Sequence, residues 1–342
     1  MDRKNFITRL ASVSLIPLGV SGFRGFESGR ESGNFVLPPV LQPGDVVGIS
    51  SPSGYILQKG ILSAAHQLQE WGYKLKIGHT IGKRHYTFGG NDEERLKDFQ
   101  NMLDDPEVKA ILCARGGYGL VRIIDRIDFS KFIRNPKWII GFSDITVLHS
   151  HINSKFRIAT IHSKMCNSFP DAWDTATEIQ KETILSIRDV LAGKKVEYTA
   201  GYHPANRKGY AKGVLVGGNL RTIENLAGTD SEIDTEGKIL FLEDVGEYLY
   251  SIDRMFWNLK RSGKLSRLKG LIVGGFRIKP EEDPDSAFGM TLEEIVMEKV
   301  KEFDYPVCFN FPVGHQRDNF ALVCGAEYEL HVKESGTLLT KV

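Results

Sequence analysis

The sequence predicts an α/β fold in which a mostly parallel, doubly wound sheet comes first and a smaller, mixed α and β region follows. From about Pro39, short apolar runs bounded by turn residues alternate with segments of helical spacing, a pattern typical of parallel sheets. After about Phe320, two apolar stretches follow each other without a helix between them, as antiparallel strands do. The length of 342 residues suits about two domains.

The first region alternates between strand and helix. Each expected strand is a short apolar run between turn signals, and these runs are 46–49, 73–77, 108–114 and 138–142. The expected helices between and after them are 61–71, 91–103, 120–127 and 146–152. Asn91 is the expected N-cap of the second helix.

The second region is mixed. Its expected strands are 238–242, 268–274, 320–332 and 337–342, and its expected helices are 250–261 and 292–303. Before them, residues 197–212 contain Gly201, Pro204 and Gly209 without a clear period, which indicates a linker. The predicted division is a leader and linker over 1–35, an N-terminal domain over 36–196, an interdomain linker over 197–212 and a C-terminal domain over 213–342.

The N-terminus resembles an export signal. A basic start at Arg3 and Lys4 is followed by a short apolar stretch over 10–20 and then by small residues, which is the order found in secretory signals. The stretch is short and contains Pro17, so it cannot cross a bilayer as a stable helix. We expect a periplasmic or otherwise exported protein; the alternative is a cytoplasmic protein with an unstructured leader.

Composition argues against several classes of function. The formal net charge is +1 and no tract is dense in lysine or arginine, so no strong field attracts nucleic acid or an anionic membrane. The four cysteines form no CxxC pair, which argues against zinc. Three of them, Cys113, Cys308 and Cys324, lie in apolar runs typical of buried positions. We expect no metal, no other cofactor and no nucleic-acid partner.

A glycine cluster, 115-RGGYG-119, directly follows an expected strand. It matches neither the dinucleotide fingerprint nor the Walker A loop, which disfavours a phosphate or nicotinamide site. One interpretation is a simple tight turn. The other is a loop whose backbone N–H groups face an anionic substrate group or an oxyanion, with the guanidinium of Arg115 suited to a carboxylate.

Ser143 lies at the corner between an expected strand and an expected helix, in 141-GFSD-144. Ligands of doubly wound sheets bind at the carboxyl ends of the strands. The helix presents its first N–H groups there, which makes the N–H of Asp144 a candidate oxyanion donor. The pattern is similar to a nucleophile elbow but lacks the second glycine of GxSxG. From local sequence alone, a helix cap explains the serine at least as well.

A nucleophilic serine needs a base and a group that orients the base. His315 lies in the loop-like 311-FPVGHQRDN-319, whereas His149 and His151 fall on an expected helix, where packing is the better explanation. Glu243 ends the apolar run 239-ILFLED-244, where a carboxylate is costly unless it is paired. The competing interpretations are a solvated loop histidine and an acid in a surface turn.

Together these segments resemble one family, the LD-carboxypeptidases (muramoyltetrapeptide carboxypeptidases) with the related microcin self-immunity peptidases. The matching stretches are 50-SSPSG-54, 115-RGGYG-119, 141-GFSD-144 with Thr146, 217-GGNL-220, 242-LEDVGEY-248, 254-RM-255 and 314-GH-315. They occur in the family's order from about Pro39 to the C-terminus. Each motif is weak alone, and their order and spacing make the resemblance specific.

The resemblance implies a Rossmann-like N-terminal domain, a smaller C-terminal domain and a homodimer. It implies a serine peptidase that removes the terminal D-alanine from a murein tetrapeptide. In this sequence the nucleophile would be Ser143, the base His315 and the residue that orients the base Glu243.

The resemblance also implies the groups around the triad. The N–H groups of Asp144 and Gly117 would form the oxyanion hole. The residues expected to contact the substrate are Arg115, Gly116 and Tyr118, with Arg115 the first candidate to bind the terminal carboxylate.

Two features depart from the family pattern. The residues after His315 match it only in part, and an export-like leader is unusual because well-known members recycle murein in the cytoplasm. Two alternative functions stay open: an amidase acting on a peptidyl-nucleotide, as in microcin immunity, and a murein-peptide binder without catalytic activity.

Overall fold

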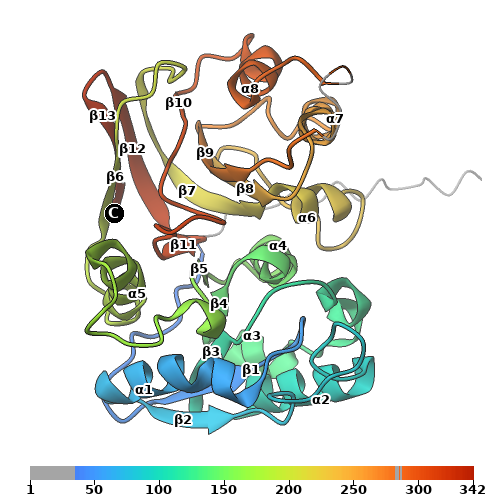
Figure 1. Cartoon of the computed structure of the whole chain (residues 1–342), viewed down its shortest axis with the longest axis vertical. Helices are drawn as coiled ribbons and strands as arrows, with labels where there is room; N and C mark the ends of the chain where they lie inside the picture. The colour runs from blue at the N-terminus through green and yellow to red at the C-terminus, as the bar shows by residue number, and fades with distance from the viewer. Residues whose placement is uncertain (1–34, 282–284, 286) are drawn as a thin grey trace, which may run out of the picture. The chain divides into compact units, whose positions relative to one another are not determined.

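The computed structural model describes residues 35–281, 285 and 287–342. The predicted leader therefore lies outside the described residues, except for Phe35 at its end. The described chain contains two sheets, one in the lower and one in the upper half of Figure 1. None of the helices in these ranges is both long enough and apolar enough to cross a bilayer.

The first sheet, as far as the chain is described, has the strand order β11–β5–β4–β3–β1–β2. Its parallel strands are β1 (Val46–Ser50), β2 (Lys74–Ile77), β3 (Val108–Cys113), β4 (Trp138–Gly141) and β5 (Thr160–His162). The order 2-1-3-4-5 is that of a doubly wound sheet, and it confirms the predicted fold class. The antiparallel edge strand β11 (Leu322–Cys324) pairs with β5, so the C-terminal part of the chain completes the first sheet.

Helices cover this sheet on both faces. They are α1 (Leu62–Glu70), α2 (Asp92–Asp104), α3 (Ser130–Arg134), α4 (Thr146–Phe156) and α5 (Glu178–Leu191). In β3, Ala110 and Leu112 join one buried apolar cluster, whereas Ile111 and Cys113 join another. Burial on both faces explains why the strands read as continuous apolar runs. The predicted cap is confirmed, because Asn91 and Glu94 form a capping box at the start of α2.

The prediction of a helix over 120–127 is wrong. Two separate 3-10 turns, Leu120–Arg122 and Ile124–Arg126, lie there instead. Several β-branched residues lower the helix propensity of this stretch. The N–H of Leu120 is moreover bound by the Asp144 carboxylate at 3.0 Å, so the segment is fixed by a tertiary contact at its first residue.

The second sheet, within the same described ranges, has the order β10–β9–β8–β7–β12–β13–β6. Its strands are β6 (Glu197–Ala200), β7 (Gly209–Asn219), β8 (Ile239–Val245), β9 (Gly270–Arg277), β10 (Val307–Cys308), β12 (Glu327–Lys333) and β13 (Gly336–Lys341). β7 to β10 pair in parallel, and β12, β13 and β6 pair antiparallel. This mixed sheet confirms the predicted C-terminal architecture.

The stretch 197–212, predicted to be a linker, contains β6 and the start of β7. The pairing of β6 is with β13, more than a hundred residues further along the chain. A strand of four residues with such a distant partner leaves almost no local signal. The predicted domain boundaries themselves stay a prediction.

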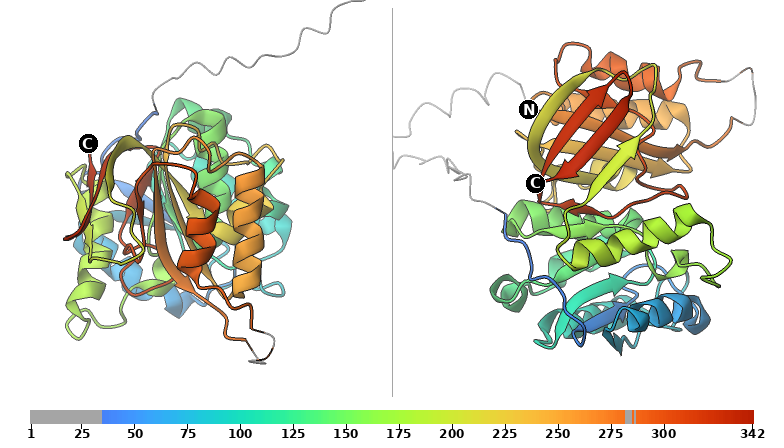
Figure 2. Two further views of the ribbon diagram at one scale, coloured as in Figure 1. Left: turned by 90° about the horizontal axis from the view of Figure 1, so that it is seen from above. Right: turned by 90° about the vertical axis from the view of Figure 1, so that its left-hand side faces the viewer.

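The helices of the second region are α6 (Leu220–Asn225), α7 (Leu249–Arg261) and α8 (Leu292–Val300). Figure 2 shows α7 and α8 side by side against one face of the sheet, and the antiparallel strands β12 and β13 further along it. Apolar side chains of α7, including Met255, fill a third buried cluster there. The first and second sheets meet where α4 packs against β7. All four cysteines are buried and free, which confirms the expectation for Cys113, Cys308 and Cys324.

Candidate active site

Ser143 occupies a strained turn between β4 and α4. Its φ is +62°, in the left-handed region that costs a non-glycine residue about 1–2 kcal/mol. Phe142 before it is extended, and a 3-10 turn over Ser143–Ile145 leads into α4. Ser143 Oγ makes no hydrogen bond with any described residue, so the helix-cap interpretation does not hold. A strained serine with a free hydroxyl is what a nucleophile elbow provides.

The glycine loop packs directly on this serine. A Cβ built on Gly116 would lie 2.9 Å from Ser143 Cβ and 3.1 Å from its Oγ, so only glycine fits without displacing the serine. The loop is held in turn by the segment after β1, where Gly54 N donates to Gly116 O at 2.9 Å. The carboxyl ends of β1, β3 and β4 are thereby fixed against one another.

Asp144 performs a structural role with its side chain. Its buried carboxylate accepts hydrogen bonds from Ser53 Oγ at 2.5 Å and from Leu120 N at 3.0 Å. Burial raises the pKa of this carboxyl, and the two hydrogen bonds oppose that shift. The carboxylate thus ties together the loops that follow β1 and β3. The backbone N–H groups of Asp144 and Gly117, in contrast, donate to no described residue.

His315 and Glu243 form a hydrogen-bonded pair. Glu243 lies near the end of β8 with its side chain fully buried, and its Oε2 is 2.5 Å from His315 Nδ1. A carboxylate can only accept, so the Nδ1–H of the imidazole donates and Nε2 is left to accept a proton. The structure therefore removes both competing interpretations: the acid is not in a solvated turn, and the histidine is not a free loop residue.

The loop around His315 is fixed by close contacts. A Cβ on Gly314 (φ +106°) would lie 2.4 Å from Glu243 Cβ, so glycine lets the loop approach the acid. The fully buried Asn319 accepts a hydrogen bond from Gly314 N at 2.8 Å through its Oδ1. Both contacts restrict the position of the imidazole between them.

The serine and the histidine approach each other through Phe142. Its ring centroid is 4.8 Å from that of His315, and Ser143 is the next residue along the chain. No hydrogen bond joins Ser143 to His315 within the described part of the chain. Such bonds are commonly long in a free enzyme and tighten when the substrate binds.

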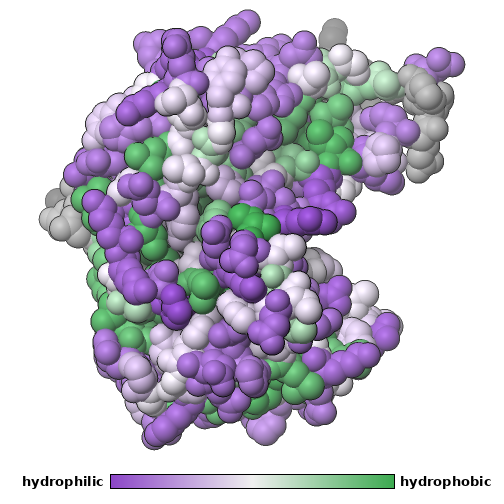
Figure 3. Space-filling view, turned by 60° about the vertical axis from the view of Figure 1, so that its left-hand side comes forward, coloured by the Kyte–Doolittle hydropathy of each residue, from purple (hydrophilic) through white to green (hydrophobic). Residues whose placement is uncertain are grey.

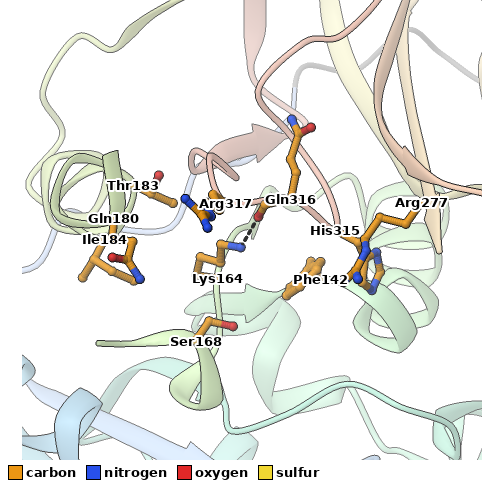
Figure 4. A pocket seen from close by; sticks show the side chains of 10 residues that line it. All are labelled: Phe142, Lys164, Ser168, Gln180, Thr183, Ile184, Arg277, His315, Gln316 and Arg317. Carbon is orange, nitrogen blue, oxygen red and sulfur yellow. Dashed lines mark hydrogen bonds between the residues drawn. The ribbon is translucent and has the colours of Figure 1, made fainter. Parts of the chain in front are cut away.

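A cavity of about 670 Å³ opens beside this pair. Residues that line it come from the turn between β4 and α4, the segment after β5, the end of β9 and the His315 loop, and include Phe142, Lys164, Arg277, His315, Gln316 and Arg317 (Figure 4). Residues of α5 close its other side. On the face drawn in Figure 3, the described chain is hollowed between its upper and lower halves, with hydrophilic side chains on the rim.

Comparisons with known proteins identify the family of this chain. The LD-carboxypeptidase N-terminal domain matches residues 47–163, and the LD-carboxypeptidase C-terminal domain matches residues 212–330. Together these matches span more than half of the chain. This protein belongs to the LD-carboxypeptidase family.

Individual relatives support the assignment. The chain is 34% identical to a probable murein peptide carboxypeptidase of Bacillus subtilis, over 88% of this chain and 93% of the relative. A crystal structure of muramoyltetrapeptide carboxypeptidase from Oxalobacter formigenes superposes with a TM-score of 0.75 at 28% identity, covering 86% of this chain and 98% of the other. The microcin C7 self immunity protein MccF has the same fold, with a TM-score of 0.77 at 22% identity and coverage of 90% and 99%.

One motif of this LD-carboxypeptidase, 217-GGNL-220, joins the two sheets. A Cβ on Gly217 would lie 1.9 Å from Phe241 O, and a Cβ on Gly218 would lie 2.5 Å from Thr146 Oγ1. The hydroxyl of Thr146 accepts a hydrogen bond from Asn219 N at 3.1 Å. Gly217 therefore allows close pairing of β7 with β8, and Gly218 allows β7 to approach the start of the helix that follows Ser143.

The residues predicted to contact the substrate lie in two places. Gly116 packs against Ser143, whereas Gly117, Asp144 and the exposed Tyr118 line a second cavity of about 320 Å³. Arg115 is exposed, and its guanidinium donates to Tyr55 O at 3.0 Å. Their contacts with a substrate stay a prediction.

Sequence reasoning missed two groups near Ser143 and His315. Lys164 lies two residues after β5, and Asn319 lies in the His315 loop, where both read as ordinary polar residues between apolar runs. Only the register of β5 beside β4, with His162 opposite Gly141, brings Lys164 close to the turn that carries Ser143. The described residues contain no group of three or more histidine, cysteine, aspartate or glutamate side chains placed to hold a metal ion.

Proposed function

We propose that this protein is a serine carboxypeptidase that releases the terminal D-alanine from murein tetrapeptides. The observation that carries the proposal is the Glu243–His315 hydrogen bond of 2.5 Å beside the strained Ser143 turn. The family and the activities named for two relatives, a probable murein peptide carboxypeptidase and a muramoyltetrapeptide carboxypeptidase, support the choice of substrate.

The reaction follows the course of a serine triad. His315 Nε2 takes the proton of Ser143 Oγ while the oxygen attacks the carbonyl carbon that precedes D-alanine. Glu243 keeps the Nδ1–H of the imidazole oriented and stabilises the cation that forms. The tetrahedral oxyanion accepts hydrogen bonds from the N–H groups of Asp144 and Gly117.

The C–N bond then breaks, and His315 gives its proton to the leaving amine, so that D-alanine departs and an ester on Ser143 remains. Water attacks this ester, with His315 taking a proton from the water and returning it to Ser143 Oγ. The products are D-alanine and the shortened peptide, and no co-reactant other than water is needed.

The test is D-alanine release from a purified murein tetrapeptide, followed by mass spectrometry. Wild-type protein should release it, and Ser143→Ala should lower kcat by at least about 10³-fold, as in other triads. Ser266→Ala is the matched control. Ser266 is exposed in the loop that follows α7, so this change should leave turnover unchanged. Full turnover by Ser143→Ala would remove the serine from the mechanism.

The same assay separates the alternatives. Cleavage of an aminoacyl sulfamoyl nucleotide with no release of D-alanine would favour an amidase of the microcin-immunity kind, which so far rests on shared fold alone. Tight binding of tetrapeptide without cleavage would favour a murein-peptide binder.

We also propose that the protein is exported and forms a homodimer. The export proposal rests on the basic start and apolar stretch of the N-terminus, and N-terminal sequencing of protein from cells tests it; an intact start at Met1 or Asp2 would contradict cleavage. Light scattering on purified protein tests the dimer. The low net charge of +1 supports the absence of a nucleic-acid partner.

A further inference from the structure

The cavity beside His315 is lined by positive charges that form no ion pair with the described residues. Lys164, Arg277 and Arg317 all line it. None of the three forms an ion pair with another residue in the described ranges. Since the other lysines and arginines of the molecule are commonly paired with carboxylates on its surface, this cluster favours an anionic ligand.

Lys164 lies where the nucleophile turn and the base loop meet. Its Nζ donates to Gln316 O at 2.5 Å, one residue beyond the base His315. The same Nζ is 5.8 Å from the ring centroid of Phe142, which precedes Ser143. Figure 4 shows Lys164 pointing into the cavity between these two segments. Its charge is therefore close to both reacting groups.

The ammonium of Lys164 has unused capacity. A lysine carries three N–H donors, and one of them is used by Gln316 O. The side chain is half-buried, and burial lowers its pKa while the charges of Asp318 and Glu243 oppose that shift. Partial burial also strengthens any charge interaction compared with one in water.

We propose that Lys164 binds the terminal carboxylate of the leaving D-amino acid and so restricts the enzyme to the chain end. The inference rests on the proposed carboxypeptidase function and names a specificity residue for it. In the substrate, the terminal carboxylate is one residue, roughly 4 Å, beyond the carbonyl that Ser143 attacks. The Lys164 ammonium lies next to the turn that carries Ser143, bound to Gln316 O and 5.8 Å from the ring centroid of Phe142.

The other cations near the site fit this role less well. Arg277 and Arg317 are exposed at the rim of the cavity, where water and salt screen their charge. Arg115 was the candidate from the sequence, and its guanidinium is engaged with the carbonyl of Tyr55. Lys164 alone among these four combines partial burial with contacts to both the nucleophile and the base segments.

The experiment compares two substrates that differ only at the carboxylate: a murein tetrapeptide ending in D-alanine and the same peptide ending in D-alaninamide. The wild type should prefer the acid by at least about 30-fold in kcat/KM, the value of one charged hydrogen bond. Lys164→Gln keeps a donor for Gln316 O and loses the charge. It should lose about 30-fold on the acid and less than about threefold on the amide, so that the preference disappears.

Three further variants make the result specific. Lys164→Arg keeps the charge and should restore most of the preference for the acid. Lys194→Gln makes the same charge change at an exposed lysine paired with Asp189 and should behave as wild type. Lys164→Met provides a second neutral variant if the glutamine variant does not fold, as judged by its thermal melt.

Each other outcome overturns the inference in a recognisable way. An equal loss on both substrates would make Lys164 a purely structural bridge between Phe142 and Gln316. Loss of the acid preference in Arg317→Gln or Arg115→Gln, with Lys164→Gln unchanged, would assign the carboxylate to that arginine. Failure of the wild type to cleave either substrate would defeat the proposed function itself, which is a different result from a wild type that cleaves both peptides equally.

Discussion

The turn that carries Ser143, the proposed nucleophile (the nucleophile turn), and the loop that carries His315, the proposed base (the base loop), are held in place by different means. Ser143 is fixed by backbone: a left-handed φ, a glycine packed against its side chain and the first turn of α4. His315 is fixed by side chains: the Glu243 carboxylate and the Asn319 amide. The first arrangement should therefore fail when a Cβ is added, and the second when a polar group is removed.

The difference also affects where charge is buried. The base loop depends on a carboxylate that is fully buried, with one oxygen, Glu243 Oε1, left without a partner among the described residues. A buried charge that is only partly satisfied costs stability. The nucleophile turn instead stores backbone strain. Two separate features of the site therefore lower stability: the partly satisfied Glu243 carboxylate beside His315 and the strained backbone at Ser143.

Glu243→Gln should have the largest effect and should sharpen the contrast. The amide cannot stabilise the imidazolium and favours the wrong tautomer, so kcat should fall by about 10⁴-fold, as for other triads. Stability should stay the same or rise, because a buried charge is removed. Glu236→Gln, at an exposed glutamate, is the control. A large loss of stability would show that the carboxylate holds the fold and not only the base.

Gly116→Ala should break the nucleophile turn without touching a polar group. The new Cβ would lie 2.9 Å from Ser143 Cβ, and a displacement of this kind lowers kcat by about 10²-fold. The melting temperature should change little, since the contact is local. Gly201→Ala is the matched control, because its Cβ would meet nothing within 4 Å. Unchanged kcat in Gly116→Ala would mean that Ser143 can shift without loss of function.

The Ser143 turn and the His315 loop also differ in how much of each could be predicted from the sequence. Strand ends and family motifs were enough to predict the fold class and the pairing of Glu243 with His315, whereas the catalytic roles of these two residues and of Ser143 stay a prediction. The φ of Ser143 could not be predicted, because a left-handed serine is a consequence of packing by Gly116 and of the entry into α4. The position of Lys164 depends on the register of β5 beside β4, and short strands such as β6 and β11 depend on partners distant in sequence.

Lowering the pH should destabilise the part of the fold that carries Ser143, because His149 is buried there. This buried imidazole donates its Nε2–H to Gly141 O at 2.8 Å, at the end of β4, and burial lowers its pKa to about 4. Between its unfolded value near 6.5 and 4, the unfolded chain binds a proton that the folded one does not, so stability is present above pH 6.5 and is lost as the pH falls. From pH 7 to 5 this amounts to about 2 kcal/mol.

Urea unfolding at pH 7 and pH 5 measures this effect. His149→Gln keeps a donor for Gly141 O and cannot titrate, so the difference in unfolding free energy between the two pH values should shrink by about 2 kcal/mol. His151, whose pKa burial also lowers to about 4, still titrates in this variant and leaves part of the pH dependence. An unchanged difference would show that folding does not lower the pKa of His149.

Thr146→Val should have the smallest effect and tests whether the two halves are independent. Valine keeps the shape of threonine but removes the acceptor for Asn219 N, which joins β7 to the start of α4. Loss of that hydrogen bond should lower the unfolding free energy by about 1 kcal/mol, measured by urea unfolding against Thr146→Ser, which keeps the hydroxyl. Because the strand, the glycine loop and the helix of its own half set the position of Ser143, kcat should change by less than about threefold. A fall in kcat as large as that expected for Gly116→Ala would mean instead that the second sheet holds the serine in place, and the contrast between a backbone-fixed nucleophile and a side-chain-fixed base would no longer stand.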